Sequence, residues 1–216
     1  IQSVIFGISI GVLGVEIFFV LSGYLIGQIL IRDFSNNASI STLANFWLRR
    51  WFRTLPLYYA IILFKFIFID HSLGYKIFAF VFFLQNNFVG IDFMPVTWSL
   101  VIEEWFYLLI PILIAVVFRN GIFISPKRFI YFLIGLILII TTARLLWVIQ
   151  TNRPWAAIVG NFPFRLDSLL IGVVLAAIKM FYKKLHNSSL LLLLMLMLIG
   201  FVACEKDYSY EGGITM

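Results

Sequence analysis

Cysteine, histidine and charged residues are all scarce in this sequence. The one cysteine, Cys204, excludes an internal disulfide and a multi-cysteine metal site. The two histidines, His71 and His186, are too far apart to form a pair of metal ligands on one helix. Charged residues make up 12% of the chain and apolar residues 62%, against roughly 45–50% apolar residues in soluble domains. We therefore expect no metal, no redox chemistry and no permanently bound cofactor.

Long apolar runs dominate the sequence, whose mean hydropathy is +1.04. Several runs have about 17–25 residues, the length that a helix needs to cross the roughly 30 Å hydrocarbon core of a bilayer. The alternating pattern of a membrane β-barrel is absent. The sequence predicts an all-α, polytopic transmembrane helical bundle, with about six spans and one short re-entrant or interfacial segment, in a single domain over residues 1–216.

The expected spans follow the apolar runs, and they cover residues 8–31, 55–69, 98–118, 129–149, 164–182 and 190–203. The run 77–84 is too short to cross comfortably, so we expect it to be re-entrant or interfacial. Residues 34–45 are rich in Ser and Asn and are predicted to form a loop. Pro56 is expected in the first turn of the second span, where a missing amide costs little.

Lysine and arginine indicate the orientation, because they accumulate on the cytoplasmic side of membrane proteins. If residues 77–84 turn back without crossing, the following basic residues all lie on the cytoplasmic side: Arg32, Arg49, Arg50, Arg53, Arg119, Lys127, Arg128, Lys183 and Lys184. If this run crosses, the last five of these residues move outside. We adopt the first arrangement. The net charge of +6 then reflects basic cytoplasmic loops in a bacterial inner-membrane protein and does not indicate nucleic-acid binding.

Charged residues inside the apolar runs are costly, so they usually face a bundle interior or a wet cavity and find partners there. Glu103 and Glu104 are two such residues, and on the adopted topology they lie in the outer half of the bundle. We predict an acceptor-side polar cluster there that also contains Glu16, Arg144, Arg165 and Asp167. Arg144 and Arg165 are the expected partners of Glu103 and Glu104. A structural salt bridge between spans is the open alternative to direct chemistry.

Arg50 and Arg53 are three residues apart, so in a helix they share a face. Guanidinium groups bind phosphate through two parallel hydrogen bonds. The pair is therefore a candidate site for a phosphorylated ligand. The alternative is an interfacial anchor that meets anionic lipid headgroups.

Four ordered segments resemble the membrane acyltransferase 3 family, whose bacterial members O-acylate carbohydrates. The segments are residues 14–26, 49–59, 98–111, and 165–168 with Gly172. The resemblance implies a cytoplasmic acyl-CoA donor, usually acetyl-CoA, and a carbohydrate hydroxyl of the cell envelope or of a secreted glycan as acceptor beyond the opposite membrane face. It implies that Arg50 and Arg53 hold the CoA phosphates. Glu103 is then expected to support catalysis on the acceptor side.

One part of the family pattern is missing. Family members carry an arginine and, ten residues later, a histidine that is implied to be the base or acyl relay, in the helix before the Gly14 segment. Residues 1–13 contain neither. We expect a chain truncated at both ends, or else a degenerate family member, and we expect residues 1–216 alone to be inactive. The alternatives are a transporter, although inverted repeats are not evident, and a non-catalytic membrane subunit.

Overall fold

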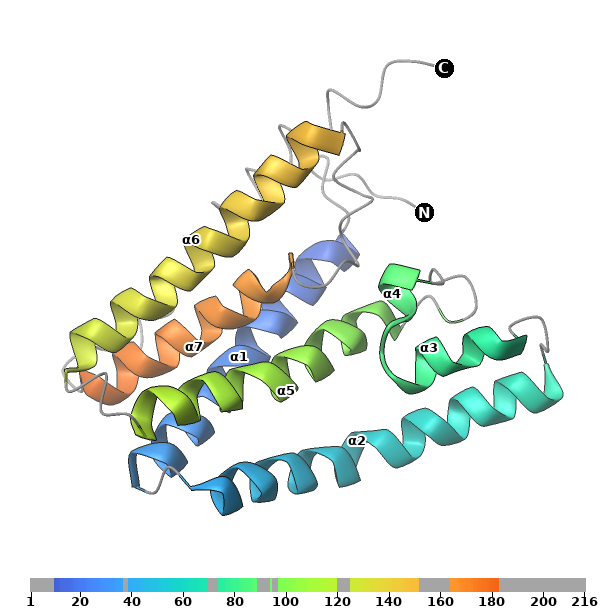
Figure 1. Cartoon of the computed structure of the whole chain (residues 1–216), viewed down its shortest axis with the longest axis horizontal. Helices are drawn as coiled ribbons and strands as arrows, with labels where there is room; N and C mark the ends of the chain where they lie inside the picture. The colour runs from blue at the N-terminus through green and yellow to red at the C-terminus, as the bar shows by residue number, and fades with distance from the viewer. Residues whose placement is uncertain are drawn as a thin grey trace. The chain divides into compact units, whose positions relative to one another are not determined.

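The structure is a computed structural model that describes residues 10–36, 39–69, 74–88, 94, 97–119, 125–151 and 164–182. Every regular element in these residues is a helix, which confirms the predicted all-α class (Figure 1). The elements are α1 (Ile10–Asn36), α2 (Ile40–Phe68), η1 (Gly74–Lys76), α3 (Ile77–Val81), α4 (Gln85–Phe88), α5 (Trp98–Arg119), α6 (Pro126–Thr151) and α7 (Leu166–Phe181). Within these described residues, α1, α2, α5 and α6 are long and apolar enough to cross a membrane.

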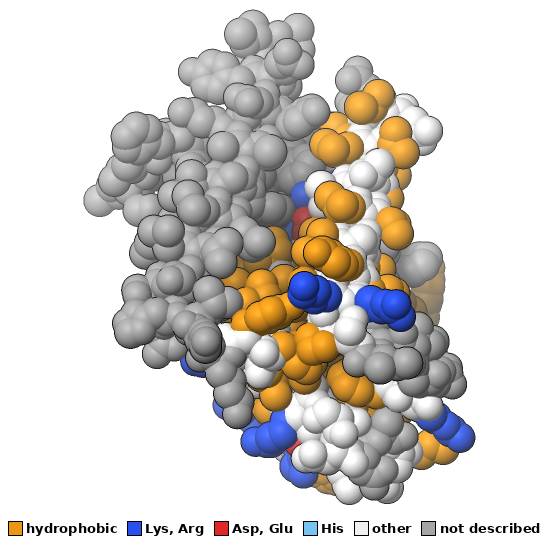
Figure 2. Space-filling model, turned by 90° about the vertical axis from the view of Figure 1, so that its left-hand side faces the viewer, with side chains coloured by type: hydrophobic (Ala, Val, Ile, Leu, Met, Phe, Trp, Pro, Cys, Tyr) orange, Lys and Arg blue, Asp and Glu red, His pale blue; other side chains and the backbone are white. Residues whose placement is uncertain are grey.

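Large hydrophobic side chains are exposed on the surface of these helices, and Figure 2 shows one face on which they are prominent. Leu57 of α2 is 67% exposed, and Leu138 of α6 is 61% exposed. A water-soluble protein rarely exposes extended apolar surface, whereas lipid chains solvate such a surface well. The exposed side chains therefore agree with the spans that the composition predicts.

The chain divides into two compact units. The first unit consists of residues 1–31 and 123–216, and it contains most of α1 together with α6 and α7. The second unit consists of residues 32–122 and contains α2, η1, α3, α4 and α5.

Helix α7 lies between α1 and α6 in the first unit (Figure 1). Its contact with α1 depends on glycine. A Cβ atom on Gly23 would lie 1.9 Å from the carbonyl oxygen of Leu169, and one on Gly172 would lie 2.1 Å from that of Val20. The two backbones therefore touch. Glycine at both positions allows this close approach of the two helices.

The other side of α7 faces α6. The rings of Phe129 and Phe181 are 6.3 Å apart, and those of Trp147 and Phe164 are 5.9 Å apart. With neighbours on both sides, α7 is buried at nearly every position from Leu166 to Ala177. Any charged side chain at its start is consequently held inside the unit.

In the second unit, tyrosines of α2 hold the short helices α3 and α4. The Tyr58 hydroxyl donates to the Phe80 carbonyl at 2.9 Å, and the Tyr59 hydroxyl donates to the Val81 carbonyl at 3.0 Å. The Trp105 indole of α5 donates to the carbonyl of Phe83 at 2.9 Å, a residue with a left-handed φ of 56°. These bonds satisfy the last two carbonyls of α3 and the non-helical Phe83 carbonyl that follows, which bilayer lipid alone could not do.

The short helices are consistent with the prediction for residues 77–84. Helix α3 has five residues, which at 1.5 Å per residue is far less than the roughly 30 Å that a crossing requires. The segment thus forms no spanning helix. Whether it is re-entrant or interfacial stays a prediction.

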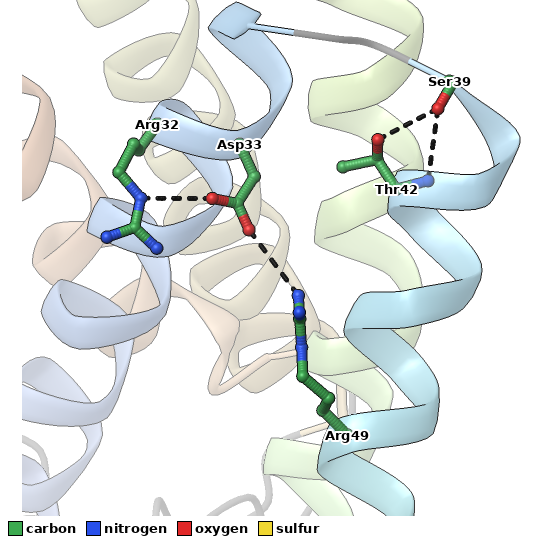
Figure 3. Close-up of polar contacts among 5 residues, drawn as sticks. All are labelled: Arg32, Asp33, Ser39, Thr42 and Arg49. Carbon is green, nitrogen blue, oxygen red and sulfur yellow. Dashed lines mark hydrogen bonds and ion pairs between the residues drawn. The ribbon is translucent and has the colours of Figure 1, made fainter.

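Two predictions around α2 are wrong. Within the predicted loop 34–45, residues 34–36 are the end of α1 and residues 40–45 are the start of α2. The Ser39 side chain caps α2 by accepting a hydrogen bond from the Thr42 amide at 3.2 Å (Figure 3). The helix therefore begins fifteen residues before the expected Leu55. Pro56 lies in the interior of α2 and not in its first turn. It leaves the Phe52 carbonyl without its usual amide donor, which membrane helices with packed neighbours tolerate.

The predicted span 164–182 corresponds to α7, which has 16 residues and is not among the described helices long enough to cross a membrane. Two other spans agree closely with the sequence. Helix α5 covers Trp98–Arg119 against the predicted 98–118, and α6 covers Pro126–Thr151 against 129–149. The predicted span 190–203, and Lys183 and Lys184 before it, lie outside the described residues.

Candidate functional site

Five polar side chains are almost completely buried in the first unit. They are 0–3% exposed and comprise Glu16, Arg144, Arg165, Asp167 and Ser168; we call them the acid–arginine cluster. Two acids and two arginines balance one another in charge. That balance is needed, because an uncompensated charge in an apolar interior costs several kcal/mol.

One half of the cluster joins α1 to the start of α7. The Arg165 Nη2 atom lies 2.8 Å from Glu16 Oε1. The Ser168 hydroxyl donates to the other oxygen, Glu16 Oε2, at 2.5 Å. Both oxygens of Glu16 are thus engaged by residues of one turn, because positions 165 and 168 are three apart and share a helix face.

The other half joins α6 to the same turn. Arg144 Nη2 lies 2.9 Å from Asp167 Oδ2, and Arg144 Nη1 donates to the Phe164 carbonyl at 3.3 Å. The second oxygen of Asp167 accepts the Ser168 amide at 3.0 Å. The three described helices of the first unit therefore meet at the beginning of α7.

The structure brings together four of the six residues that the sequence analysis places in a polar cluster. Glu103 and Glu104 belong to the second unit, so their expected pairing with Arg144 and Arg165 stays a prediction. Ser168 lies in the segment 165–168 of the family resemblance, but it is not among the predicted site residues. Its spacing of three from Arg165, at the start of an apolar helix, is the signal that could have found it.

The second unit positions Arg50 through Tyr107. The Arg50 guanidinium lies 3.9 Å from the centre of the Tyr107 ring and donates a hydrogen bond to the Tyr107 hydroxyl. The ring therefore contributes a cation–π contact as well as an acceptor. Arg50 is half-buried, whereas Arg53 is exposed. The proposal that both arginines hold phosphate stays a prediction.

The backbone of Tyr107 explains why α2 and α5 meet here. Pro111 lies inside α5, four residues after Tyr107, so it provides no amide for the Tyr107 carbonyl. The Trp47 indole donates to this carbonyl at 2.9 Å instead. Trp47 and Arg50 share a face of α2 and hold Tyr107 at both its carbonyl and its hydroxyl.

Glu104 lies on the same contact between α2 and α5. Its Oε1 atom accepts the Thr54 hydroxyl at 3.1 Å, and the carboxylate is 5% exposed. It also lines a cavity of about 490 Å³, together with Trp51, Leu55, Tyr59, Val81, Phe82, Phe83, Leu84, Trp105 and Leu108. Glu103 does not line this cavity.

A third group of charges lies at the surface of the second unit (Figure 3). Asp33 is 3.1 Å from Arg32 and 3.7 Å from Arg49, and the two arginine side chains are 66% and 68% exposed. Exposed pairs contribute little to stability, typically about 0–1 kcal/mol. This group is therefore a useful reference for the buried one.

Long apolar helices with an exposed apolar surface, and a balanced charge cluster buried among them, define a multi-pass helical membrane protein. The family model of the acyltransferase domain, Acyl_transf_3, matches residues 1–209. The chain therefore belongs to this acyltransferase family.

The chain is similar to curated proteins named for O-acetylation. It is 28% identical to the peptidoglycan O-acetyltransferase OatA of Listeria monocytogenes, over 94% of this chain and 37% of that protein. It is 29% identical to the O-acetyltransferase OatA of Staphylococcus aureus strain NCTC 8325, over 95% of this chain and 38% of that protein. The chain thus spans less than two fifths of these relatives. No solved structure gives a significant match.

Proposed function

We propose that this protein transfers an acyl group, most simply acetyl, from cytoplasmic acyl-CoA to a hydroxyl of a cell-envelope or secreted carbohydrate across the inner membrane. Membership of the acyltransferase family supports the reaction class. The names of the similar proteins support acetyl as the acyl group, and the Listeria relative is named for peptidoglycan. No described feature favours a transporter or a non-catalytic subunit over this reaction.

The acid–arginine cluster is the observation that carries the proposal. Ionisable residues within membrane-spanning helices are rare and usually mark a functional site. Glu16 already accepts a hydroxyl hydrogen bond, from Ser168. A carbohydrate hydroxyl that took the place of the Ser168 hydroxyl would make the same bond, and the two arginines could donate to neighbouring oxygens of the sugar. The cluster thus suits an acceptor that carries several hydroxyl groups.

The reaction itself forms an ester and consumes a thioester. The acceptor oxygen bonds to the acyl carbon, the carbon–sulfur bond breaks, the hydroxyl proton passes to a general base, and CoA leaves as its thiol. The resemblance assigns the base to a histidine that residues 1–13 do not contain. We assign Glu103 a supporting role and expect residues 1–216 alone to be inactive.

Arg50 and Arg53 are the proposed donor-side residues. Tyr107 holds the Arg50 guanidinium in place, and Arg53 is exposed on the same helix. CoA phosphates would bind the free donors of Arg50 together with Arg53. Because these arginines would contact acetyl-CoA itself, loss of either contact should raise the apparent KM for acetyl-CoA.

The test uses the full-length protein in native membranes, with labelled acetyl-CoA and detection of label in envelope carbohydrate. Arg53→Ala should raise the apparent KM for acetyl-CoA, while Arg128→Ala, another exposed arginine, should not. Glu16→Gln should lower kcat with the protein still present in the membrane. No transfer by the unaltered protein would refute the enzyme proposal. An unchanged KM in Arg53→Ala would remove that residue from the donor site.

A further inference from the structure

The cavity beside Glu104 is lined mostly by apolar side chains, and the proposed reaction assigns no ligand to it. Its volume of about 490 Å³ is within the roughly 300–1,000 Å³ of small-molecule sites in proteins. Its walls come from α2, from the end of α3 and the connection to α4, and from α5, all within the second unit. Nine of the ten lining residues are aliphatic or aromatic. Glu104 is the one residue with a formal charge.

Two of the aromatic lining residues, Tyr59 and Trp105, direct their polar tips to the backbone. The Tyr59 hydroxyl donates to the Val81 carbonyl, and the Trp105 indole donates to the Phe83 carbonyl. Their rings therefore present apolar surface to the cavity. A sugar would find too few partners on such walls, because each of its hydroxyls needs a hydrogen bond when buried.

Glu104 gives the cavity one hydrogen-bond acceptor. Its Oε1 atom accepts the Thr54 hydroxyl, and its buried Oε2 atom makes no hydrogen bond within the described residues. The Trp51 side chain and the Arg50 guanidinium also interact with the carboxylate, and the side chains of Tyr58 and Tyr59 lie close enough to interact with its charge. A ligand that donates to Oε2 would satisfy it, whereas an ionised phosphate or carboxylate has only acceptor oxygens and would leave Oε2 without a donor. The ligand should therefore be neutral and carry a hydroxyl or an amide N–H.

The depth of the cavity indicates where its ligand comes from. The lining residues 51–59 lie in the central part of α2, and 104–108 lie in the first half of α5. Both helices are candidate membrane spans. A molecule that reaches this depth beside apolar walls is most readily one that is already dissolved in the bilayer.

We propose that this cavity is a binding site for a neutral membrane amphiphile, a long-chain alcohol, whose hydrocarbon chain fills the apolar walls and whose hydroxyl donates to Glu104. None of the residues of the acid–arginine cluster lines the cavity. Arg50 does not line the cavity either, although its guanidinium interacts with the Glu104 carboxylate. The inference does not depend on the acyl-transfer reaction.

The experiment uses photoactivatable hexadecanol with a diazirine in its chain, added to membranes that contain the full-length protein. Matched probes are the corresponding hexadecane, which has no donor, and hexadecanoate, which is an anion. After irradiation, mass spectrometry locates the labelled peptides. We expect hexadecanol to label the peptides around residues 51–59, 81–84 and 104–108, and an excess of unlabelled hexadecanol to remove that label.

Variants separate the cavity from general lipid contact. Leu108→Trp should fill the cavity and prevent labelling, while Leu57→Trp, at a position 67% exposed on α2, should leave it unchanged. Glu104→Leu should lower the preference for hexadecanol over hexadecane by about five- to tenfold, as expected for the loss of one hydrogen bond in an apolar site. If the Leu108→Trp variant does not accumulate in the membrane, the proposal is still tested by competition with unlabelled hexadecanol and by the preference for hexadecanol over hexadecane in Glu104→Leu.

Three results would overturn the proposal. If hexadecanol and hexadecane label the protein equally, and Glu104→Leu does not change this, then hydrocarbon chains contact the cavity without recognition of the hydroxyl. Stronger labelling by hexadecanoate would contradict the role of the carboxylate. Label confined to exposed positions such as Leu57 would show that no alcohol occupies the cavity.

Discussion

The buried pair of Glu16 and Arg165 allows a quantitative test of the acid–arginine cluster. Glu16 is 0% and Arg165 1% exposed, and their charged atoms are 2.8 Å apart. Removal of one partner leaves an uncompensated charge in an apolar interior. Breaking a buried ion pair in this way typically costs about 3–5 kcal/mol. Glu16→Leu and Arg165→Met should therefore each lower the free energy of unfolding by that order.

The double variant should be less damaging than the sum of the two single ones. With both charges removed, neither is left unpaired, and replacement of a whole buried pair by apolar residues is often neutral or stabilising. The coupling energy should thus be several kcal/mol, well above the roughly 0.3–0.5 kcal/mol scatter of independent sites. Ser168→Ala alone should cost about 1.5–3 kcal/mol, since it removes a hydrogen bond to a carboxylate.

The assay is reversible unfolding in mixed micelles, followed by far-ultraviolet circular dichroism. The exposed pair of Asp33 and Arg49, 3.7 Å apart, provides a control cycle with the same chemistry. Asp33→Leu and Arg49→Met should change the free energy of unfolding by no more than about 1 kcal/mol each. If the effects of Glu16→Leu and Arg165→Met on the free energy of unfolding are additive, or are as small as those of the surface variants, Glu16 and Arg165 do not form the buried ion pair described above.

Three further predictions concern helix packing and topology. Gly172→Ala should destabilise by about 1–3 kcal/mol, because its Cβ would lie 2.1 Å from a backbone oxygen of α1; Gly135→Ala, with open space around it, should not destabilise in the same unfolding assay. Trp47→Phe should lower the free energy of unfolding by about 1 kcal/mol. The loss should be smaller in a protein that also carries Pro111→Ala, which restores an amide for the Tyr107 carbonyl. An equal loss with and without Pro111→Ala would show that Trp47 does not replace the missing amide. A cysteine at exposed Lys127 should react with a membrane-impermeant thiol reagent only from the cytoplasmic side, and labelling from outside would reverse the adopted topology.

The sequence predicted the helical class and several spans because the bilayer imposes a strong local requirement. A run of apolar residues long enough to cross must be helical to satisfy its own backbone, so α5 and α6 begin and end within a few residues of the prediction. The start of α2 was missed because one capping side chain, Ser39, outweighs the polar composition that follows it.

The partners of the buried charges were harder to predict, because they are far apart in the chain. Ser168 and Glu16 are 152 positions apart, and nothing local in either segment selects the other. Likewise, the contact of Trp47 with Tyr107 depends on Pro111 through a missing backbone donor. Such a contact becomes visible only when both helices are placed side by side.

The proposed reaction is tested most directly by the sidedness of acetyl transfer. Inside-out and right-side-out membrane vesicles containing the full-length protein are supplied with labelled acetyl-CoA, which cannot itself cross the membrane. Acyl transfer across the membrane predicts label in carbohydrate only when acetyl-CoA reaches the cytoplasmic face, and loss of that label in Glu16→Gln. Carbohydrate labelling no greater than in vesicles without the protein would contradict the assignment.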